Sequence, residues 1–268
     1  MSAVEEPLTN QRDDAAAPLL SALVVARNEE AQLAQCLERL GFADEVVVVL
    51  DRSTDGSAAI ARRYGARILE GAWEREGERR NAGIAACWGD WILEVDADER
   101  VTSALAAEIR AAIAGASDGY FLVPLANHIG GRLVRYGWGA YNGVARKSSL
   151  FRKGAKVWGE GRVHPKIALS GPAHALSEAM DHFVDNGISD MIARLNRYTD
   201  LAALDALERG TRPRLWPSLR RVFSRAWKSY VARRGYREGA WGVALALFSA
   251  LYPLLTYLKV ATRDQRAP

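Results

Sequence analysis

The chain has 268 residues, of which 49% are hydrophobic and 25% are charged. It is long enough for one large domain with a sizeable core, with or without an appendage, and this composition excludes a disordered or fibrous protein. The formal net charge is only +4 at pH 7, so the position of the basic residues says more about partners than their number. Two cysteines, Cys36 and Cys87, are too few for a disulfide framework or a cysteine-based zinc site, and we expect both to be small core residues.

Residues 1–18 are polar and acidic, whereas a signal peptide needs a basic region followed by an apolar one. We expect this segment to be a disordered tail and the first ordered element to begin near Leu19. The protein is therefore predicted to stay on the cytoplasmic side of the membrane.

The next hundred residues alternate between two kinds of pattern. Helix-like spacing of apolar residues, three and four apart, occurs in residues 29–40, 55–65, 76–89 and 102–115. Short runs of branched and aromatic residues, typical of buried strands, precede and follow these segments. The runs are residues 20–26, 45–50, 66–70, 90–95 and 119–124. This alternation predicts an α/β fold with a mainly parallel central sheet and helices on both faces.

Beyond residue 126 the pattern changes twice. Residues 127–186 are rich in glycine, aromatic and basic residues, with short strand candidates at 148–153, 155–160 and 164–171, so we expect loops and hairpins there. Helical spacing returns at Ile188 and continues to Gly210, a plausible C-terminal cap. Residues 188–268 are accordingly predicted to be a helical C-terminal extension.

The end of the chain combines basic, aromatic and apolar residues. Between Thr211 and Arg237 basic residues alternate with Trp, Phe and Tyr without any acid, and residues 240–258 carry no charge. The second run approaches the ~20 residues that span a bilayer, although Pro253 weakens that interpretation. We expect residues 211–268 to associate with an anionic membrane surface; nucleic acid is the alternative partner of the basic segment, and the uncharged run favours lipid.

Polar clusters follow three of the predicted strands, where ligands bind in open α/β sheets. They are "RNEE" at 27–30, "DRSTDGS" at 51–57 and "DADER" at 96–100. In the second cluster Ser53 or Thr54 can cap the next helix. A further cluster, "ERRNAG", begins at Glu78 and places basic and amide groups at a helix start, where they can meet a diphosphate.

Asp96 and Asp98 can both point at one cation, because alternate residues of an extended chain project the same way. Carboxylate oxygens suit Mg²⁺ or Mn²⁺, which would bridge the phosphates of a nucleotide. The alternative is a solvated turn, but the neighbouring polar strand ends make that explanation weaker. Glu99 is expected only to open the next helix.

Four stretches, "SALVVARNEEAQLAQCLERL", "VVVVLDRSTDGSAAIARRYGA", "ERRNAGIAACWGDWILEVDADE" and "ARLNRYTDLAALDALERG", together resemble the family 2 glycosyltransferases, closest to the lipopolysaccharide-core and polysaccharide-assembly branch. The resemblance covers most of residues 19–210. It implies a GT-A fold over residues 19–187, with a nucleotide-sugar-binding half at 19–125 and an acceptor-side half at 126–187. It also implies inverting transfer from a nucleotide-sugar donor, expected to be a UDP-sugar, and dependence on Mg²⁺ or Mn²⁺.

The resemblance also assigns roles to single residues at the strand ends. Asn28, Glu29 and Asp51 match positions that hold the base and ribose of the donor. Arg80 and Asn81 match a basic-residue-plus-Asn pair near the donor. Asp96 and Asp98 match the family's Asp-x-Asp pair, in which the second Asp usually contacts the metal and the first bonds ribose or metal-bound water.

An inverting transfer to a hydroxyl needs a carboxylate base. Our candidate is Glu160, in a Gly-flanked loop that can reach a cleft, with Asp181 and Asp185 as reserves; a solvated loop Glu is the alternative. The family often has His-Glu where this chain has His164 and Pro165, so the resemblance does not identify the base. His164 and His182 match family histidines and are candidates to complete a metal shell, although such histidines are more often structural.

Two further questions stay open in the sequence. Tyr136, Trp138, Tyr141 and Trp158 form an aromatic group that can stack on a sugar or fill a small core. The expected acceptor is a hydroxyl of a lipid-linked glycan in lipopolysaccharide or cell-surface polysaccharide assembly. The alternatives are a polyprenyl-phosphate acceptor, which needs no base, and an inert membrane scaffold of the same fold.

Overall fold

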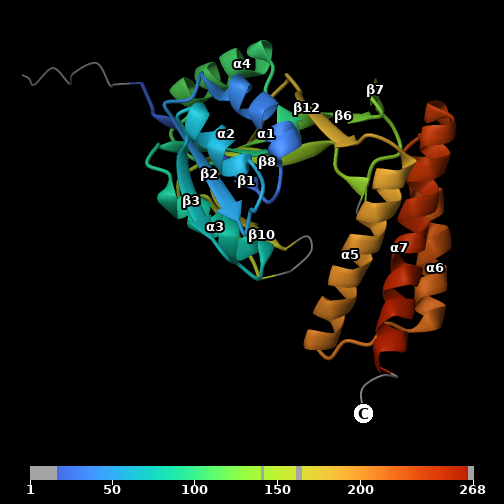
Figure 1. Ribbon diagram of the computed structural model, residues 1–268. Coiled ribbons are helices and arrows are strands. Elements are labelled where there is room, and N and C mark those ends of the chain that lie inside the picture. Colours follow the sequence, from blue (N-terminus) through green and yellow to red (C-terminus); the bar gives the residue numbers. More distant parts are fainter. Residues whose placement is uncertain (1–16, 140–141, 161–164, 265–268) are drawn as a thin grey trace, which may run out of the picture.

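The computed structural model describes residues 17–139, 142–160 and 165–264. Its centre is a mixed ten-stranded sheet in the order β3-β2-β1-β4-β8-β6-β12-β5, with β11 and β7 also paired to β6 (Figure 1). A separate two-stranded ribbon joins β9 to β10. The strands are β1 Leu20–Ala26, β2 Glu45–Asp51, β3 Arg67–Gly71, β4 Trp91–Asp96, β5 Glu99–Arg100, β6 Tyr120–Ile129, β7 Arg132–Leu133, β8 Arg146–Arg152, β9 Lys156–Trp158, β10 Ile167–Leu169, β11 Ala173–Ala175 and β12 Met180–Asp185.

The helices follow the predicted alternation in the first half and then gather at the C-terminus. Four α-helices belong to the sheet unit and three to the C-terminal unit, with short 3-10 and π segments between them. Their bounds are α1 Glu30–Leu37, η1 Glu38–Leu40, α2 Ser57–Arg63, α3 Glu76–Ala86, α4 Ser103–Gly115, α5 Ile188–Glu208, α6 Leu215–Trp227, η3 Lys228–Ala232, η4 Gly235–Glu238 and α7 Ala240–Asp264.

The strand β1 shows why the sheet is buried on both faces. It pairs in parallel with β2 and β4, and alternate residues enter two different cores. Val24 packs with α1, α2 and α4 on one face, whereas Leu23 packs with α3 on the other. Figure 1 shows α1, α2 and α4 above the sheet and α3 below it. Cys36 and Cys87 are buried, one in each core, as expected.

The sheet continues past the predicted repeat because β8 enters it from the loop-rich region. β8 runs antiparallel between β4 and β6, which makes β6 parallel to β4. The proposed division at residues 125 and 126 therefore falls inside β6. The strand candidates near 148–153, 155–160 and 164–171 are confirmed as β8, β9 and β10, whereas β5, β7, β11 and β12 had no predicted counterpart.

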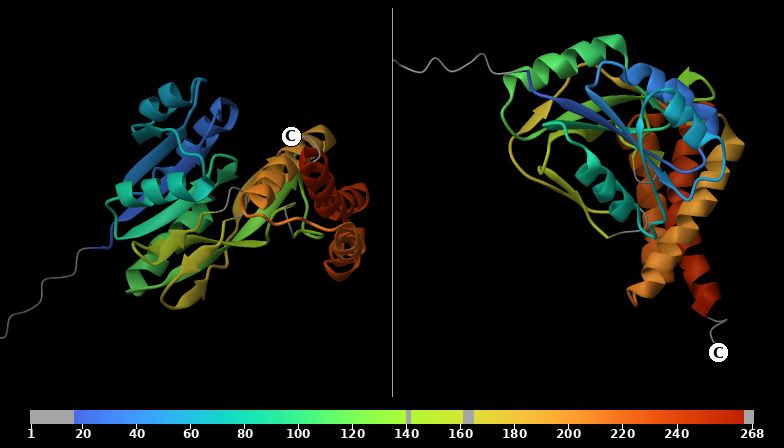
Figure 2. Two further views of the ribbon diagram at one scale, coloured as in Figure 1. Left: turned by 90° about the horizontal axis from the view of Figure 1, so that it is seen from below. Right: turned by 60° about the vertical axis from the view of Figure 1, so that its left-hand side comes forward.

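A third core holds the C-terminal helices together. α5 and α7 pack through Met191, Leu195, Leu245 and Phe248, and this core includes Trp138 from the sheet side. In Figure 1 and in the left view of Figure 2, α5 lies between the sheet unit and α7. Residues 240–263 of α7 are long and apolar enough to cross a membrane by length and composition, but 44% of the most apolar window is buried in the protein.

Polar contacts reinforce the packing of α7 on α5. Lys259 donates to the Asn196 carbonyl at 2.8 Å and lies 3.0 Å from Asp200. Arg263 pairs with the same Asp200 at 2.7 Å. α7 therefore closes the C-terminal unit instead of standing apart from it.

Two local expectations are wrong. Neither Ser53 nor Thr54 caps α2, because the N-cap is Gly56 and Ser53 instead accepts a bond from the first loop. Glu99 does not open α4; that helix is capped by Thr102, whose Oγ1 accepts from the Leu105 N–H. Glu99 lies in β5 and is buried.

Three predicted features lie outside the described residues. They are Tyr141, His164 and residues 1–16 of the predicted tail 1–18. The remaining members of the aromatic group do not gather in one place. Trp138 is buried in the third core, Trp158 packs beside α3, and Tyr136 lies against Arg237. The three aromatics that the structure describes therefore form neither one sugar-stacking surface nor one small core.

Candidate active site

The loops after β1 and β2 are joined through Asn28. Asn28 Oδ1 accepts a hydrogen bond from the Thr54 N–H at 2.9 Å, and the Asn28 N–H donates to Ser53 Oγ at 3.2 Å. Asn28 has a φ of 57°, in the left-handed region that Asn tolerates better than most residues. The Gly56 N–H donates to Glu30 Oε2 at 2.9 Å, so the two predicted donor loops form one connected rim.

Asp51 lies at the expected end of β2, but its carboxylate is buried and already bonded. Oδ1 accepts from Arg52 Nε at 3.0 Å and from the Trp73 N–H at 3.1 Å. Oδ2 accepts from Arg52 Nη2 and Arg79 Nη1, both at 3.4 Å. Since a carboxylate has about four acceptor positions, a donor nucleoside would have to replace one of these partners.

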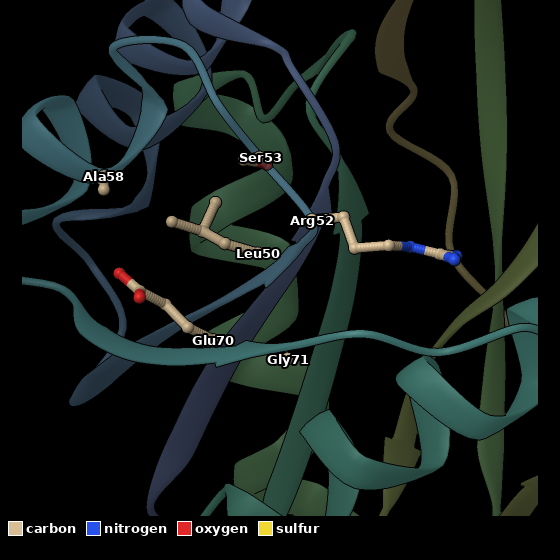
Figure 3. A pocket seen from close by; sticks show the side chains of 6 residues that line it. All are labelled: Leu50, Arg52, Ser53, Ala58, Glu70 and Gly71. Atoms are coloured by element: carbon tan, nitrogen blue, oxygen red, sulfur yellow. The ribbon is translucent and has the colours of Figure 1, made fainter.

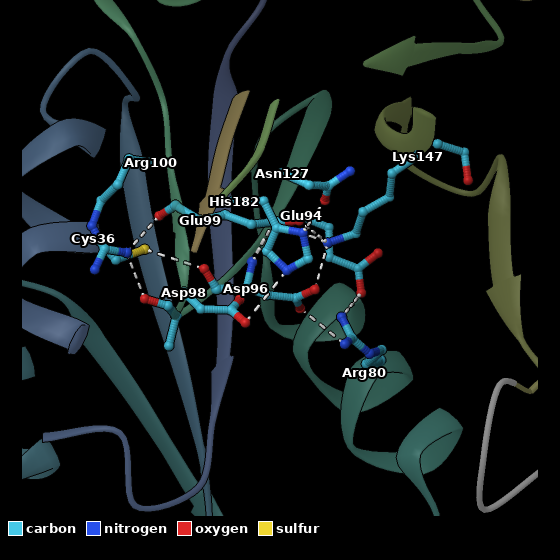
Figure 4. A network of polar contacts seen from close by, with 12 residues as sticks. Cys36, Arg80, Glu94, Asp96, Asp98, Glu99, Arg100, Asn127, Lys147 and His182 are labelled. Carbon is cyan, nitrogen blue, oxygen red and sulfur yellow. Dashed lines mark hydrogen bonds and ion pairs between the residues drawn. The ribbon is translucent and has the colours of Figure 1, made fainter. Parts of the chain in front are cut away.

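Asp96, at the end of β4, is held between two cations (Figure 4). Arg80 Nη2 lies 2.9 Å from Oδ1, and Lys147 Nζ lies 2.7 Å from Oδ2. Burial opposes ionisation of Asp96, but these two charges outweigh it and hold the pKa of the carboxyl well below its usual range. Lys147 also contacts Glu99 at 3.0 Å. Asp96 is thus ionised and neutralised within the protein.

Asp98 differs from Asp96 in both exposure and partner. Its side chain is 31% exposed, and Oδ2 lies 3.4 Å from His182 Nε2. His182 Nδ1 lies 2.8 Å from Asn127 Oδ1, so both ring nitrogens face oxygen acceptors. Burial lowers the pKa of His182, but the hydrogen bond and charge of Asp98 outweigh it and raise the pKa above its ordinary value. An imidazolium that donates at both nitrogens fits these partners.

A second ion cluster surrounds Glu94, two residues before Asp96 in β4. Glu94 of β4 is fully buried and contacts Arg80 at 2.7 Å and Lys156 at 2.5 Å. Burial opposes ionisation of Glu94, but Lys156 and Arg80 outweigh it and hold the pKa below its ordinary value. Trp158 Nε1 donates to the same carboxylate at 3.3 Å. Arg80 therefore joins the two clusters and is itself buried.

The predicted donor residue Asn81 contacts protein backbone. Its Nδ2 donates to the Trp158 carbonyl at 2.8 Å, and its Oδ1 accepts from the Trp158 N–H at 2.9 Å. These two hydrogen bonds fix Trp158 at the end of β9, two residues before Glu160. The Glu160 side chain is 89% exposed and pairs with Arg75 at 3.1 Å. Asn81 thus positions the loop that carries the candidate base.

The reserve bases lie at different places on β12. Asp181 pairs with His128 at 3.0 Å. Asp185 is buried and pairs with Arg194 of α5 at 2.6 Å. Burial raises the pKa of Asp185 to about 6, against the opposing charge of Arg194. Asp185 thereby ties the start of α5 to the sheet.

Glu29 connects the rim to these acids electrostatically. Burial raises the pKa of Glu29, and the charge of Asp98 raises it further. Arg197 of α5 acts in the opposite direction and lowers it. The rim, the end of β4 and the first turns of α5 are therefore close enough to affect one another.

The acidic side chains of the site fit a divalent cation only if phosphates and water supply most of its ligands. Within residues 17–139, 142–160 and 165–264 the structure gathers no group of three or more His, Cys, Asp or Glu side chains placed to hold a metal ion. Asp98 offers a partly exposed carboxylate, whereas both oxygens of Asp96 already face cations. Mg²⁺ commonly binds through one or two carboxylates plus phosphates and water, and Asp98 suits that arrangement.

Two hollows of the described part of the chain are lined by residues that follow β2 and β5. One, of about 360 Å³, is lined by Leu50, Ala58 and Glu70 on the α2 side of β2, and Arg52 extends away from it (Figure 3). Another, of about 380 Å³, is bordered by Arg100 and Asp181.

Comparison with known proteins decides the family. The model of glycosyl transferase family 2 matches residues 21–157. The chain is 30% identical over 263 residues to the lipopolysaccharide core biosynthesis glycosyltransferase LpsC of Rhizobium meliloti (strain 1021), with 91% of this chain and 92% of that protein covered. The chain belongs to glycosyl transferase family 2. This family 2 enzyme is a glycosyltransferase with a GT-A-like α/β fold, as expected from the sequence.

Two further proteins are similar to this chain over different shares of its length. An uncharacterized glycosyltransferase of Rickettsia bellii (strain RML369-C) is 25% identical over 255 residues, covering 90% of this chain and 85% of that protein. Among solved structures, glucosyl-3-phosphoglycerate synthase of Mycobacterium tuberculosis, crystallised with Mn²⁺ and UDP, has a TM-score of 0.36 at 24% identity, covering 42% and 45% of the two chains.

Some residues of this family 2 site gave little signal in the sequence. Lys147, Lys156 and Glu94 lie at or inside apolar strand segments, where a charged residue is costly to bury unless it is paired. That cost is the available signal, but it does not identify the partner. Lys147 and Asp96 are 51 residues apart and meet only because β8 enters the sheet between β4 and β6.

Proposed function

We propose that this family 2 glycosyltransferase is inverting and dependent on a divalent metal, and that it moves a sugar from a nucleotide-sugar donor to a hydroxyl of a lipid-linked glycan. The nucleotide we propose is UDP, and the process is assembly of lipopolysaccharide or another cell-surface polysaccharide. The observation that carries the proposal is the contrast between Asp96 and Asp98. One is neutralised by protein cations, and the other is partly exposed at the same strand end.

The roles proposed for the donor side follow from these contacts. Asn28 and Glu29 line the rim for the nucleoside, and Asp51 lies behind it. Arg80 and Asn81 act through other groups, since Arg80 holds Asp96 and Asn81 holds the β9 loop. Both Asp96 oxygens already contact cations, so Asp96 can accept a hydrogen bond from ribose or from a metal-bound water only while it keeps its contacts with Arg80 and Lys147.

Asp98 is the proposed direct contact to a divalent cation, and His164 remains a proposed additional ligand. Such a cation supplies positive charge for the leaving diphosphate, which is the part of the transition state that gains negative charge. Glu160 is the proposed base that takes the proton of the acceptor hydroxyl. Its exposure allows it to move from Arg75 to an acceptor.

The proposed location is the cytoplasmic face of the inner membrane, with α6 as the contacting helix. Exposed Trp216, Phe223 and Trp227 lie at 81%, 75% and 64% exposure, on a helix with Arg220 and Arg221. Large exposed aromatics beside arginines fit an anionic lipid surface. The LpsC relative, named for lipopolysaccharide core biosynthesis, supports a lipid-linked glycan as acceptor.

The decisive test is Asp98→Ala. We expect loss of sugar transfer by about 100-fold or more, as for removal of one charge-stabilising group, together with loss of Mn²⁺-dependent thermal stabilisation by UDP. The matched control is Glu178→Ala, which removes an exposed carboxylate away from the site. The assigned site is wrong if the Asp98→Ala enzyme keeps both properties.

A second test separates the proposed hydroxyl acceptor from a polyprenyl phosphate, which is already an anion. Glu160→Gln should reduce transfer to a hydroxyl by about 100-fold or more, the usual size of a general-base contribution. UDP binding should not change, because Glu160 pairs with Arg75 and not with the donor rim. Full activity of this variant would remove Glu160 as the base and favour the phosphate acceptor.

A further inference from the structure

The first turns of α5 present a cationic face to the sheet unit. Arg194, Arg197 and Tyr198 are spaced three and four apart, which places them on one side of a helix. Arg194 is fixed by Asp185 at 2.6 Å, so this side is anchored at the end of β12. The guanidinium of Arg197 lies over the Tyr198 ring at 5.4 Å. α5 itself runs between the sheet unit and α7, as Figure 1 and the left view of Figure 2 show.

Most cations around the acids are already paired with carboxylates. Arg80 and Lys147 hold Asp96, and Lys156 holds Glu94. The remaining ion pairs of this kind join Arg52 and Arg79 to Asp51, Arg75 to Glu160 and Arg194 to Asp185. These side chains are committed to the fold and to orienting acids.

Two exposed arginines at this edge differ from that group. Within the described part of the chain, Arg27 and Arg197 have no carboxylate oxygen within 4.0 Å of their guanidinium nitrogens in the ion pairs found. The charge of Arg197 reaches Glu29 on the rim: burial and Asp98 raise the pKa of Glu29, and Arg197 lowers it. Tyr198, its neighbour, is near enough to Asp96 for the charge of that carboxylate to contribute to its raised pKa, after the larger effect of burial.

We propose that Arg197 binds the diphosphate of the donor and stabilises the charge that this leaving group gathers. The inference rests on the proposed function. In the transfer, the bond from the anomeric carbon to the β-phosphate oxygen breaks and its electron pair stays on that oxygen. The acceptor oxygen bonds the same carbon and its proton passes to the base. A guanidinium facing the β-phosphate offers two parallel donors to this developing charge.

The first turns of α5 combine a fixed arginine with an adjustable one. Before the donor arrives, Arg197 is exposed and contacts the Tyr198 ring, and among residues 17–139, 142–160 and 165–264 no ion pair has to break for it to turn. Its neighbour Arg194 keeps the helix in place through Asp185. The donor diphosphate is therefore bound between a fixed strand end and a fixed helix by one adjustable side chain.

The experiment compares binding of UDP and uridine, each with Mn²⁺, to the full-length wild type and to single variants by calorimetry. Arg197→Gln should weaken UDP binding by about tenfold or more, because a charge-assisted contact is lost, and should leave uridine binding unchanged. Its kcat should fall by about 10²-fold. Arg197→Lys should recover part of the UDP affinity, since it keeps the charge and loses the paired donors.

Two variants serve as comparisons. Arg209→Gln removes an exposed arginine directly after α5, which pairs with Asp205 at 3.7 Å, and this variant should bind UDP as the wild type does. Arg27→Gln tests the other unpaired arginine of this edge. The inference is overturned if Arg197→Gln retains its UDP affinity, or if uridine binding falls equally, or if Arg27→Gln alone carries the loss. A wild type that binds no UDP would overturn the proposed donor together with this inference.

Discussion

The residue Asp185 owes its orientation to an irregularity in β12. The register with β6 shifts between Phe183 and Asp185, so Val184 is an extra residue in the ladder. His182 is paired with Asn127 and Asp185 with Ile129, two positions along β6, which places His182 and Asp185 on the same face. The bulge thus places Asp185 on the same face of β12 as His182. The charge of Asp98 contributes to the raised pKa of Asp185, after burial and Asp190.

Asp185 should give the protein a pH-dependent stability term. Burial raises its pKa from 3.8 in the unfolded chain to about 6 in the folded protein. Its contribution is fully present below the unfolded pKa and is lost as pH rises through the folded pKa, because the unfolded chain releases the proton first. As pH rises from about 4 to about 6, the free energy of unfolding of the wild type should therefore fall relative to that of Asp185→Asn.

This expectation is checked by urea unfolding of both proteins across that range, with Asp118→Asn as an exposed control. A stability difference that stays constant with pH, or shifts in favour of the wild type, would contradict it. The same reasoning explains why the sequence could identify Asp185 only as a reserve candidate for the catalytic base. Its raised pKa comes from burial and from neighbours that the fold supplies.

At the same scale, Asp96 and Asp98 were predictable as a pair and not as two different groups. Their spacing at the end of an apolar run indicated a shared edge, and the structure places both there. The partners of Asp96 come from α3 and β8, which are remote in sequence. A strand-end pattern contains no information about which cation reaches which carboxylate.

Among the elements, α6 is the most unusual in its exposure. Trp216, Phe223 and Trp227 are spaced seven and four apart, so they share one helix face, and Ser218 on another face is buried. A soluble helix normally buries such aromatics. Their exposure is the feature that a lipid surface would explain, whereas α7 contributes part of its apolar surface to the third core.

Replacing the three aromatics together tests this role. Trp216→Ser, Phe223→Ser and Trp227→Ser in one protein should reduce binding to vesicles containing phosphatidylglycerol by about tenfold or more, since each removes apolar surface from the contact. Thermal stability should change little, because all three side chains are exposed. The control is Trp88→Ser, an exposed tryptophan of the sheet unit. Equal vesicle binding by the triple variant and wild type would exclude α6 as the contact.

Elements of this fold differ in how far they could be predicted. The long apolar runs that became β1, β2 and β4 had clear patterns, and so did α5. β5 and β7 have two residues each, too few for any periodicity. β12 has the sequence MDHFVD, in which polar residues interrupt the pattern because they serve the site.

For the whole molecule, the C-terminal unit is part of the folded protein and not a detachable tail. α7 packs on α5, and α5 carries Arg194 and Arg197 beside the acids. Removing residues 211–268 would expose the apolar side of α5, so loss of membrane binding by a truncated chain would not identify the contact. The sequence indicated helices here, but the three-way packing depends on contacts between segments that no local pattern specifies.

The buried ions around β4 have a consequence for redesign. Three cations, Arg80, Lys147 and Lys156, face three acids, Glu94, Asp96 and Glu99. The six side chains come from the five elements α3, β4, β5, β8 and β9. Removing one member leaves an opposite charge buried without compensation, which typically costs about 3–5 kcal/mol. A new donor specificity is therefore hard to reach by single steps at this centre. Engineers who alter Asp96 should vary its two cations in the same library and leave Asp98 and the rim as the independently adjustable positions.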